Sequence, residues 1–79
     1  MKVKIIVTLK SGVLDPQGKA IQQTLNSMGF SNIKDVRQGK YFDIEIDELN
    51  KEKAKEIIEE ICKKLLTNVV IEDYTINLK

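Results

Sequence analysis

Segments with a two-residue hydrophobic repeat alternate along this chain with segments whose apolar residues recur every three or four positions. The two-residue repeat predicts strands with one buried face, and the longer repeat predicts amphipathic helices. We therefore predict strands over residues 2–10, 33–38, 41–47 and 69–78. One helix is expected after the first strand and another before the last.

The predicted strands differ in how regularly they alternate. One face of the first strand carries Val3, Ile5, Val7 and Leu9. Ile6 interrupts its polar face, which indicates that this second face is partly covered. The strand over residues 41–47 points Phe42, Ile44 and Ile46 inward and Tyr41, Asp43, Glu45 and Asp47 outward, the last three as an acidic stripe. The final strand places Val70, Tyr74, Ile76 and Leu78 on one side.

The first predicted helix has clear limits. Asp15 can accept hydrogen bonds from free backbone N–H groups as the N-cap, and Pro16 suits the first helical position, where no donor is needed. Gly29 supplies a left-handed stop. The buried stripe is expected to consist of Ala20, Ile21, Thr24, Leu25 and Met28.

The second predicted helix begins at the N-cap Asn50 and ends at Thr67-Asn68. Glu52 lies in its first turn, where a negative charge suits the helix dipole. Its apolar face is expected to consist of Ala54, Ile57, Ile58, Ile61, Cys62 and Leu65.

The order of these elements is strand, helix, strand, strand, helix, strand. Gly39-Lys40 predicts a tight hairpin turn between the two central strands. The order predicts an α+β fold, with an antiparallel sheet and both helices on one face, in a ferredoxin-like two-layer sandwich. No linker or repeat divides the chain, so we expect one domain over residues 1–79.

The size of the chain favours self-association. A domain of 79 residues buries only about 60% of the surface of its unfolded chain. Such domains usually need disulfides, a metal or oligomerisation for support. The single cysteine, Cys62, excludes an internal disulfide, and the lack of histidine argues against a zinc site. We therefore expect homo-oligomers.

Charge and hydropathy narrow the functional classes. A net charge of +1 without a basic stripe argues against nucleic-acid binding. No apolar stretch is long enough to span a membrane, and a lone cysteine with no signal-peptide pattern predicts a cytoplasmic protein. Without histidine, the common nucleophile–base pairs and imidazole metal sites are missing. We expect no catalytic residue, cofactor or metal on this chain.

Two motifs resemble binding sites without completing them. Residues 12–19 nearly form a phosphate-binding P-loop, but one residue too many separates the glycines, and Ala20 replaces the hydroxyl that would bind magnesium. Residues 39–42 lie where an RNA-recognition fold carries its aromatic signature. The acidic stripe that follows would repel a phosphate backbone. Cys62 is expected to be a small buried hydrophobe.

Several segments carry a family resemblance over the whole chain. They are residues 9–10, 12–20, 35–40 and 62–74, together with the stop at Gly29. The most specific is Val13-Leu14-Asp15-Pro16-Gln17-Gly18, followed by Cys62-Lys63-Lys64-Leu65-Leu66-Thr67-Asn68 with Ile71-Glu72-Asp73-Tyr74. In this order and spacing they resemble the PurS family, the small subunits of formylglycinamidine ribonucleotide (FGAM) synthase. Val69 stands where some members have proline.

The resemblance implies a non-catalytic subunit of a carbon–nitrogen ligase of purine biosynthesis that takes its amido group from glutamine. In that complex a glutaminase subunit, PurQ, releases ammonia. A synthetase subunit, PurL, holds ATP and magnesium and adds the ammonia to formylglycinamide ribonucleotide. The resemblance implies that this chain bridges the two and assists ammonia transfer. It also implies a homodimer or homotetramer.

Six polar residues near strand or helix ends fall within the matching segments, and we take them as candidates for partner contacts. They are Lys10, Asp15, Arg37, Lys40, Asn68 and Glu72. Read from residue type alone, Asp15 and Asn68 are caps and the others face solvent, so both interpretations stay open. Ile6, Val69 and Ile71 could make the outer sheet face adhesive, and the open sheet edge could extend across a dimer.

Two other functions share this order of elements. An ACT-like regulatory module, which binds a small ligand at a subunit interface, also has a glycine after its first strand, and Gly12 loosely satisfies this requirement. An RNA-binding module is the third hypothesis, and the acidic stripe speaks against it.

Overall fold

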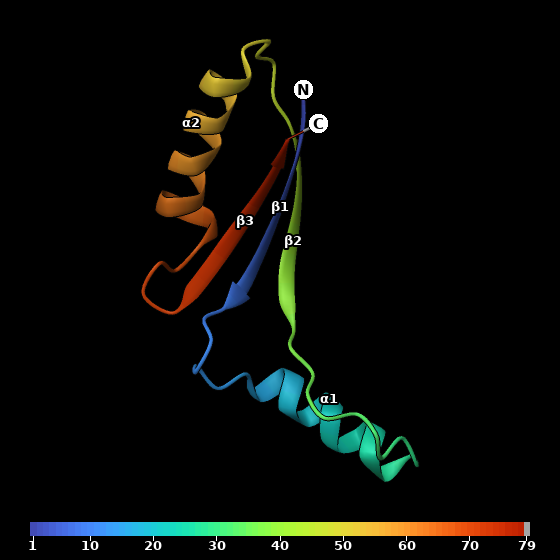
Figure 1. Ribbon diagram of the computed structural model, residues 1–79. Helices are drawn as coiled ribbons and strands as arrows, with labels where there is room; N and C mark the ends of the chain where they lie inside the picture. Colours follow the sequence, from blue (N-terminus) through green and yellow to red (C-terminus); the bar gives the residue numbers. More distant parts are fainter. Residues whose placement is uncertain (79) are drawn as a thin grey trace.

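The structure is a computed structural model and describes residues 1–78. The chain forms β1 (Lys2–Leu9), α1 (Pro16–Ser27), β2 (Gly39–Glu45), α2 (Lys51–Ile61), a π-helical turn η1 (Cys62–Leu66) and β3 (Glu72–Leu78). The strands make one antiparallel sheet in the order β2–β1–β3 (Figure 1). The predicted α+β class with an antiparallel sheet is confirmed. No helix in residues 1–78 is long and apolar enough to cross a membrane.

The core lies between the sheet and α2. Val3, Ile5 and Val7 of the central strand are fully buried, as the alternation predicted. They pack against Ile58 of α2 and Cys62 of η1, and α2 covers this face of the sheet (Figure 1). Cys62 is a free, fully buried cysteine, as predicted. Burial is the main reason that the pKa of its thiol is raised, so the thiol stays protonated.

The π-helical turn changes which residue of the second helix reaches the core. The Thr67 N–H donates to the Cys62 carbonyl oxygen at 2.8 Å, which inserts one residue into the turn. Leu66 therefore packs against the core, while Leu65 is 79% exposed. The prediction that Leu65 lies on the apolar face is wrong. Ile57, also predicted there, is 39% exposed because it lies beside the central line of Ala54, Ile58 and Cys62.

Residues 33–38 do not form the predicted strand. They run back along α1 (Figure 1). Side-chain amides of Gln22 and Asn26 donate to the carbonyl oxygens of Lys34 and Ile33, so these carbonyls are paired with a helix rather than a sheet. The hairpin turn predicted at Gly39-Lys40 is wrong as well, because these residues open β2.

Helix α1 lies beyond the end of the sheet, so the predicted packing of both helices on one face is wrong (Figure 1). Its expected buried stripe is open, with Ile21 43% and Met28 67% exposed. The molecule is elongated, with extents of 49 × 24 × 14 Å and a radius of gyration of 16.0 Å. A compact domain of this length would have about 12 Å. We call α1 and the returning residues 28–36 the arm.

The last strand begins later than predicted. Residues 69–71 form a turn, held by a hydrogen bond from the Ile71 N–H to the Asn68 carbonyl oxygen at 3.0 Å, and β3 starts at Glu72. Val70 is 78% exposed and does not share a face with Tyr74. On the outer sheet face, the acidic stripe is opposed by lysines, since Lys2 pairs with Glu45 and Lys4 with Asp43.

Candidate partner-contact site

The six residues proposed from sequence gather where β1 ends and β2 and β3 begin. Lys10 follows β1, Lys40 is the second residue of β2, and Glu72 is the first of β3. Asn68 lies in the turn before β3. Asp15 and Arg37 lie on the two segments that join the arm to the sheet. We call Lys10, Asp15, Arg37, Lys40, Asn68, Glu72 and the neighbouring Asp73 the sheet-end site.

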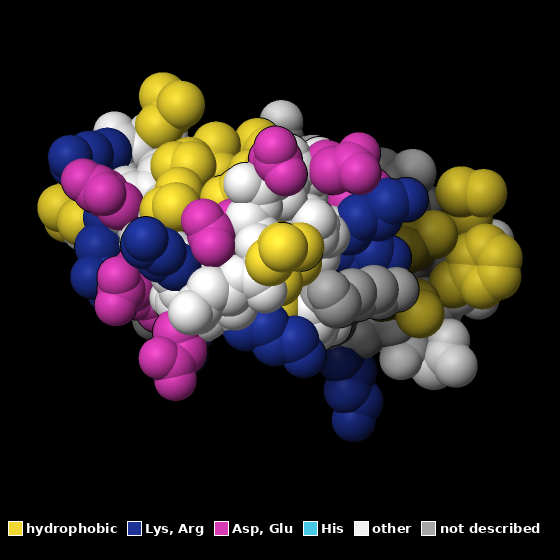
Figure 2. Space-filling model, turned by 90° about the horizontal axis from the view of Figure 1, so that it is seen from above, with side chains coloured by type: hydrophobic (Ala, Val, Ile, Leu, Met, Phe, Trp, Pro, Cys, Tyr) yellow, Lys and Arg dark blue, Asp and Glu magenta, His cyan; other side chains and the backbone are white. Residues whose placement is uncertain are grey.

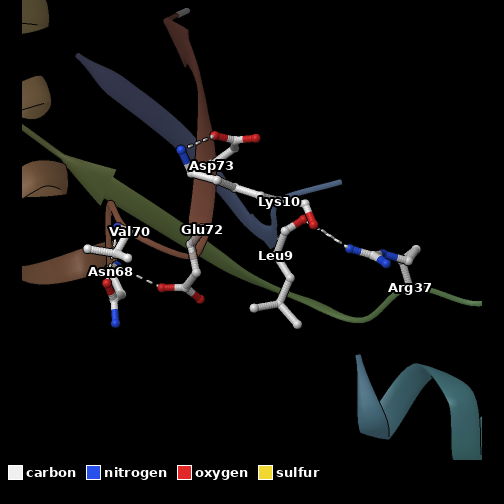
Figure 3. Close-up of polar contacts among 7 residues, drawn as sticks. All are labelled: Leu9, Lys10, Arg37, Asn68, Val70, Glu72 and Asp73. Carbon is white, nitrogen blue, oxygen red and sulfur yellow. Dashed lines mark hydrogen bonds and ion pairs between the residues drawn. The ribbon is translucent and has the colours of Figure 1, made fainter. Parts of the chain in front are cut away.

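Glu72 ties three parts of the sheet-end site together. One carboxylate oxygen lies 3.5 Å from the Lys40 ammonium nitrogen. The other accepts a hydrogen bond from the Asn68 N–H at 2.8 Å (Figure 3). The Glu72 side chain is only 12% exposed. The Asn68 side-chain oxygen in turn accepts from the Val70 N–H at 3.2 Å. Asn68 therefore closes a turn instead of capping a helix. Glu72 links this turn to Lys40 of β2 through contacts within the chain.

Lys10 and Arg37 engage the same region from the other side. The Lys10 ammonium lies 3.7 Å from Asp73, in a pair that is exposed on both sides. The Arg37 guanidinium donates to the carbonyl oxygens of Leu9 and Lys10 at 3.1 Å each (Figure 3). It also donates to the Val13 carbonyl oxygen at 3.3 Å. Arg37 is thus committed to the backbone of its own chain.

Asp15 caps α1, as predicted, and has a second role. One carboxylate oxygen accepts from the Gly18 N–H at 2.9 Å, and the other accepts from the Gln38 N–H at 2.7 Å. These hydrogen bonds, led by that of Gln38 and assisted by the Arg37 charge, hold the pKa of Asp15 below its ordinary value. Asp15 is 7% exposed, so its carboxylate is enclosed, and these hydrogen bonds keep it ionised.

A shallow cleft of about 320 Å³ opens beside these groups. Val7 and Leu9 line it together with Asp15, Lys40 and Glu72. Both oxygens of each carboxylate already accept hydrogen bonds or pair with lysine. The capacity left for other molecules lies in the partly exposed ammonium groups of Lys10 and Lys40. Chemically, the sheet-end site is suited to binding carboxylates on another surface.

Three residues of this region were not predicted from the sequence. Asp73 pairs with Lys10, the Gln38 N–H binds Asp15, and Gly18 permits a close approach of backbones. A Cβ at Gly18 would lie 2.1 Å from the Val36 carbonyl oxygen. Glycine inside a helix lowers stability by about 1 kcal/mol relative to alanine. A glycine within a predicted helix is therefore a sequence signal that another segment packs closely against it. The other two contacts use backbone or exposed groups that leave no pattern.

The arm carries a second, apolar surface. Ala20, Ile21, Thr24 and Leu25 line an open groove of about 250 Å³ along α1. Phe30, after the helix, is 51% exposed. Figure 2 shows hydrophobic side chains gathered at the end of the molecule that the arm occupies. We call Ile21, Leu25, Met28 and Phe30 the arm face.

Comparison with known proteins gives a consistent picture. Residues 2–79 match the family described as PurS, phosphoribosylformylglycinamidine (FGAM) synthase. The chain is 50% identical over 78 residues to the PurS subunit of Methanocaldococcus jannaschii, covering 99% of this chain and 94% of that protein. It is 48% identical over 73 residues to the PurS subunit of Bacillus subtilis, covering 92% and 86%.

The chain also resembles solved PurS structures in its three-dimensional fold. A crystal form of Bacillus subtilis PurS has a TM-score of 0.89 at 46% identity and covers 99% of this chain and 96% of that chain. A structure described as PurLQS from Thermotoga maritima has a TM-score of 0.88 at 38% identity and covers 96% and 93%. Because these alignments span nearly the whole chain, the likeness includes the arm.

Proposed function

Because the chain belongs to the PurS family of FGAM synthase subunits, we propose that it is the bridging subunit of a glutamine-dependent FGAM synthase. In this role it assists the passage of ammonia from a PurQ-type glutaminase subunit to a PurL-type synthetase subunit. The observation that carries the proposal is the match over residues 2–79, joined to the likeness to the Thermotoga maritima PurLQS structure. The ACT-like alternative is not favoured.

The state of the charged groups supports a bridging role. Asp15, Arg37 and Glu72 bind groups of their own chain. Such side chains stabilise a shape and are poorly placed to take part in a reaction. We propose that the catalytic groups, ATP and magnesium belong to the partner subunits and that this chain holds no cofactor. Partners other than protein subunits are not expected, and a cytoplasmic location suits the reduced, buried Cys62.

Within the sheet-end site, the six candidates divide into two groups. Lys10 and Lys40, whose side chains are 42% and 58% exposed, are proposed to contact acidic residues of a partner subunit. The remaining four are proposed to hold the lysines and the adjoining turn in place. Charge pairs at the rim of an interface mainly set association rate and specificity.

The arm face is proposed to bind a second copy of this chain. Three of the arm-face residues, Ile21, Met28 and Phe30, are exposed and Leu25 is half-buried, and the radius of gyration exceeds that of a compact domain. A small domain with so little buried surface gains stability by oligomerisation. Pairing of two arms would bury this surface and give the homo-oligomer that the sequence predicts.

The experiment that tests the function uses purified PurL and PurQ from the same source, with and without this chain. Glutamine-driven and ammonia-driven synthesis of FGAM are measured side by side. We expect glutamine-driven synthesis to require the chain and ammonia-driven synthesis to proceed without it. Full glutamine-driven activity in its absence would overturn the proposal.

A further inference from the structure

The arm is held together as a unit of its own. The Gln22 side-chain amide donates to the Lys34 carbonyl oxygen at 2.8 Å. The Asn26 amide donates to the carbonyl oxygens of Phe30 at 2.9 Å and Ile33 at 3.2 Å. These bonds fasten the returning segment along α1. Helix α1 and the returning segment therefore form one rigid unit, which can change its orientation relative to the sheet only as a whole.

Only two chain segments join the arm to the sheet, and we call them the elbow: residues 10–15 leading out and residues 37–38 leading back. Helix α1 makes no extensive contact with any other helix or strand in residues 1–78 (Figure 1). The angle between arm and sheet is therefore set by contacts within the elbow.

Those contacts are reciprocal. Arg37, on the segment leading back, donates to the carbonyl oxygens of Leu9, at the end of β1, and of Lys10, on the segment leading out (Figure 3). It also donates to the Val13 carbonyl oxygen on the segment leading out. Asp15, on the segment leading out, accepts from the Gln38 N–H on the segment leading back at 2.7 Å. Each segment thus supplies a charged side chain that binds the backbone of the other. Such charge-assisted hydrogen bonds are about twice as strong as neutral ones.

The backbone conformation of the elbow allows these hydrogen bonds between its two segments. Gly12 has a φ of +89° in the turn closed by the hydrogen bond from the Val13 N–H to the Lys10 carbonyl oxygen. This turn directs the carbonyls of Lys10 and Val13 toward one guanidinium group. Gly18 then allows the Val36 carbonyl to pass against the start of α1. The segments consequently approach closely enough for both charged residues to reach across.

We propose that Arg37 and Asp15 are positioning residues that fix the angle between the arm and the sheet. They thereby present the arm face and the sheet-end lysines in one relative orientation. This inference rests on the proposed function, in which both surfaces are used during assembly. Freeing the elbow leaves the β-sheet folded but spreads the two surfaces over many orientations. Assembly of the complex then requires a higher concentration of this chain, while the maximal rate of glutamine-driven synthesis is unchanged.

The test compares Arg37→Met and Arg37→Lys with the control Lys34→Met, which removes an exposed cation from the neighbouring arm segment. Spin labels at exposed Gln23 in the arm and exposed Lys55 on α2 report the arm-to-sheet distance by pulsed electron resonance. Labelled chain is diluted with unlabelled chain so that only intramolecular distances contribute. We expect a narrow distribution in the parent and the control, a broad one for Arg37→Met, and partial narrowing for Arg37→Lys.

The second readout is glutamine-driven FGAM synthesis as a function of chain concentration. Arg37→Met should raise the concentration for half-maximal rate roughly tenfold, as expected for lost charge-assisted hydrogen bonds, with the maximal rate retained. An unchanged distance distribution for Arg37→Met would overturn the inference. If Arg37→Met does not fold, Asp15→Asn, which turns an amide N–H₂ toward either Gly18 or Gln38, is judged by the same criterion.

The two proposals fail in distinguishable ways. If the parent chain does not stimulate glutamine-driven synthesis, the proposed function fails, while the distance distributions still decide the elbow. If the parent stimulates and Arg37→Met matches it in both readouts, the elbow inference alone fails.

Discussion

Lys40 and Glu72 meet across the central strand although neither belongs to it. Lys40 pairs with Val7 on one side of β1, and Glu72 pairs with Leu9 on the other. Their side chains close to 3.5 Å over the strand between them. Both edge strands are thereby linked at the end of the sheet where the arm begins.

Glu72→Ala should destabilise the chain. It removes the acceptor of the Asn68 N–H in a side chain that is 12% exposed, so we expect a loss of about 1–3 kcal/mol in the free energy of unfolding. Urea denaturation measures it. The control is Asp73→Ala, which breaks an exposed pair and should cost about 0–1 kcal/mol. Equal losses in the two variants would contradict an internal role for Glu72.

Gly18→Ala should destabilise the arm, against the usual trend. In an unobstructed helix this change would stabilise by about 1 kcal/mol. Here the new methyl group would lie 2.1 Å from the Val36 carbonyl oxygen, and overpacking of this kind costs about 1–3 kcal/mol. Thermal unfolding gives the sign, with Gln17→Ala at the exposed neighbouring position as the control. A stabilised Gly18→Ala variant would show that the close approach is absent in solution.

The contribution of Asp15 should depend on pH. Hydrogen bonds from the Gln38 and Gly18 N–H groups place its folded pKa below that of the unfolded chain. Its stabilisation is therefore complete above the unfolded pKa of about 3.9 and is lost as pH falls through the lower folded value. The stability difference between the parent chain and Asp15→Asn should be constant at neutral pH and shrink in acid. Urea unfolding along a pH series tests this, and a pH-independent difference would refute it.

Ile21→Asp should weaken self-association. A charge within the arm face would have to be desolvated in an interface, so we expect the dissociation constant to rise at least about tenfold. Sedimentation analysis over a range of concentrations measures it. Gln23→Asp places the same charge at another exposed position of α1 and should have little effect. If both variants associate like the parent, another surface joins the copies.

Lys10→Ala and Lys40→Ala should impair coupling without unfolding the chain. Both ammonium groups are partly exposed and are proposed to meet acidic groups of a partner. We expect each to raise the chain concentration for half-maximal glutamine-driven rate roughly threefold, with a larger effect at low salt. Lys55→Ala, at an exposed position on α2, is the matched control. A response equal to that of the control would remove the lysines from the contact site.

The sequence predicts the structure best where residues are buried by other parts of the same chain. Val3, Ile5 and Val7 alternate because α2 covers their face, so periodicity predicted β1 and its orientation. Capping chemistry likewise located Asp15 and Asn50, since each side chain accepts hydrogen bonds at a helix start.

Other features depend on contacts between segments, which the pattern of hydrophobic and polar residues does not reveal. The stripe of Ile21 and Leu25 predicts a helix with one covered face but does not say whether the same chain covers it. Residues 33–38 contain enough apolar side chains for a strand, yet their position is decided by amide side chains of α1. The family-matching segments did collect the sheet-end site, because its members lie at element ends that meet at one edge.

The open arm face also bears on the fate of surplus subunits in a cell. A copy without a mate displays Met28 and Phe30 near the tip of a protruding helix. Exposed apolar side chains on a sparsely anchored segment are what chaperones and proteases recognise in incomplete proteins. If two arms pair as proposed, assembly would cover these side chains, and the lifetime of each copy would then be coupled to its incorporation. The same apolar surface would then both join the subunits and keep their numbers matched.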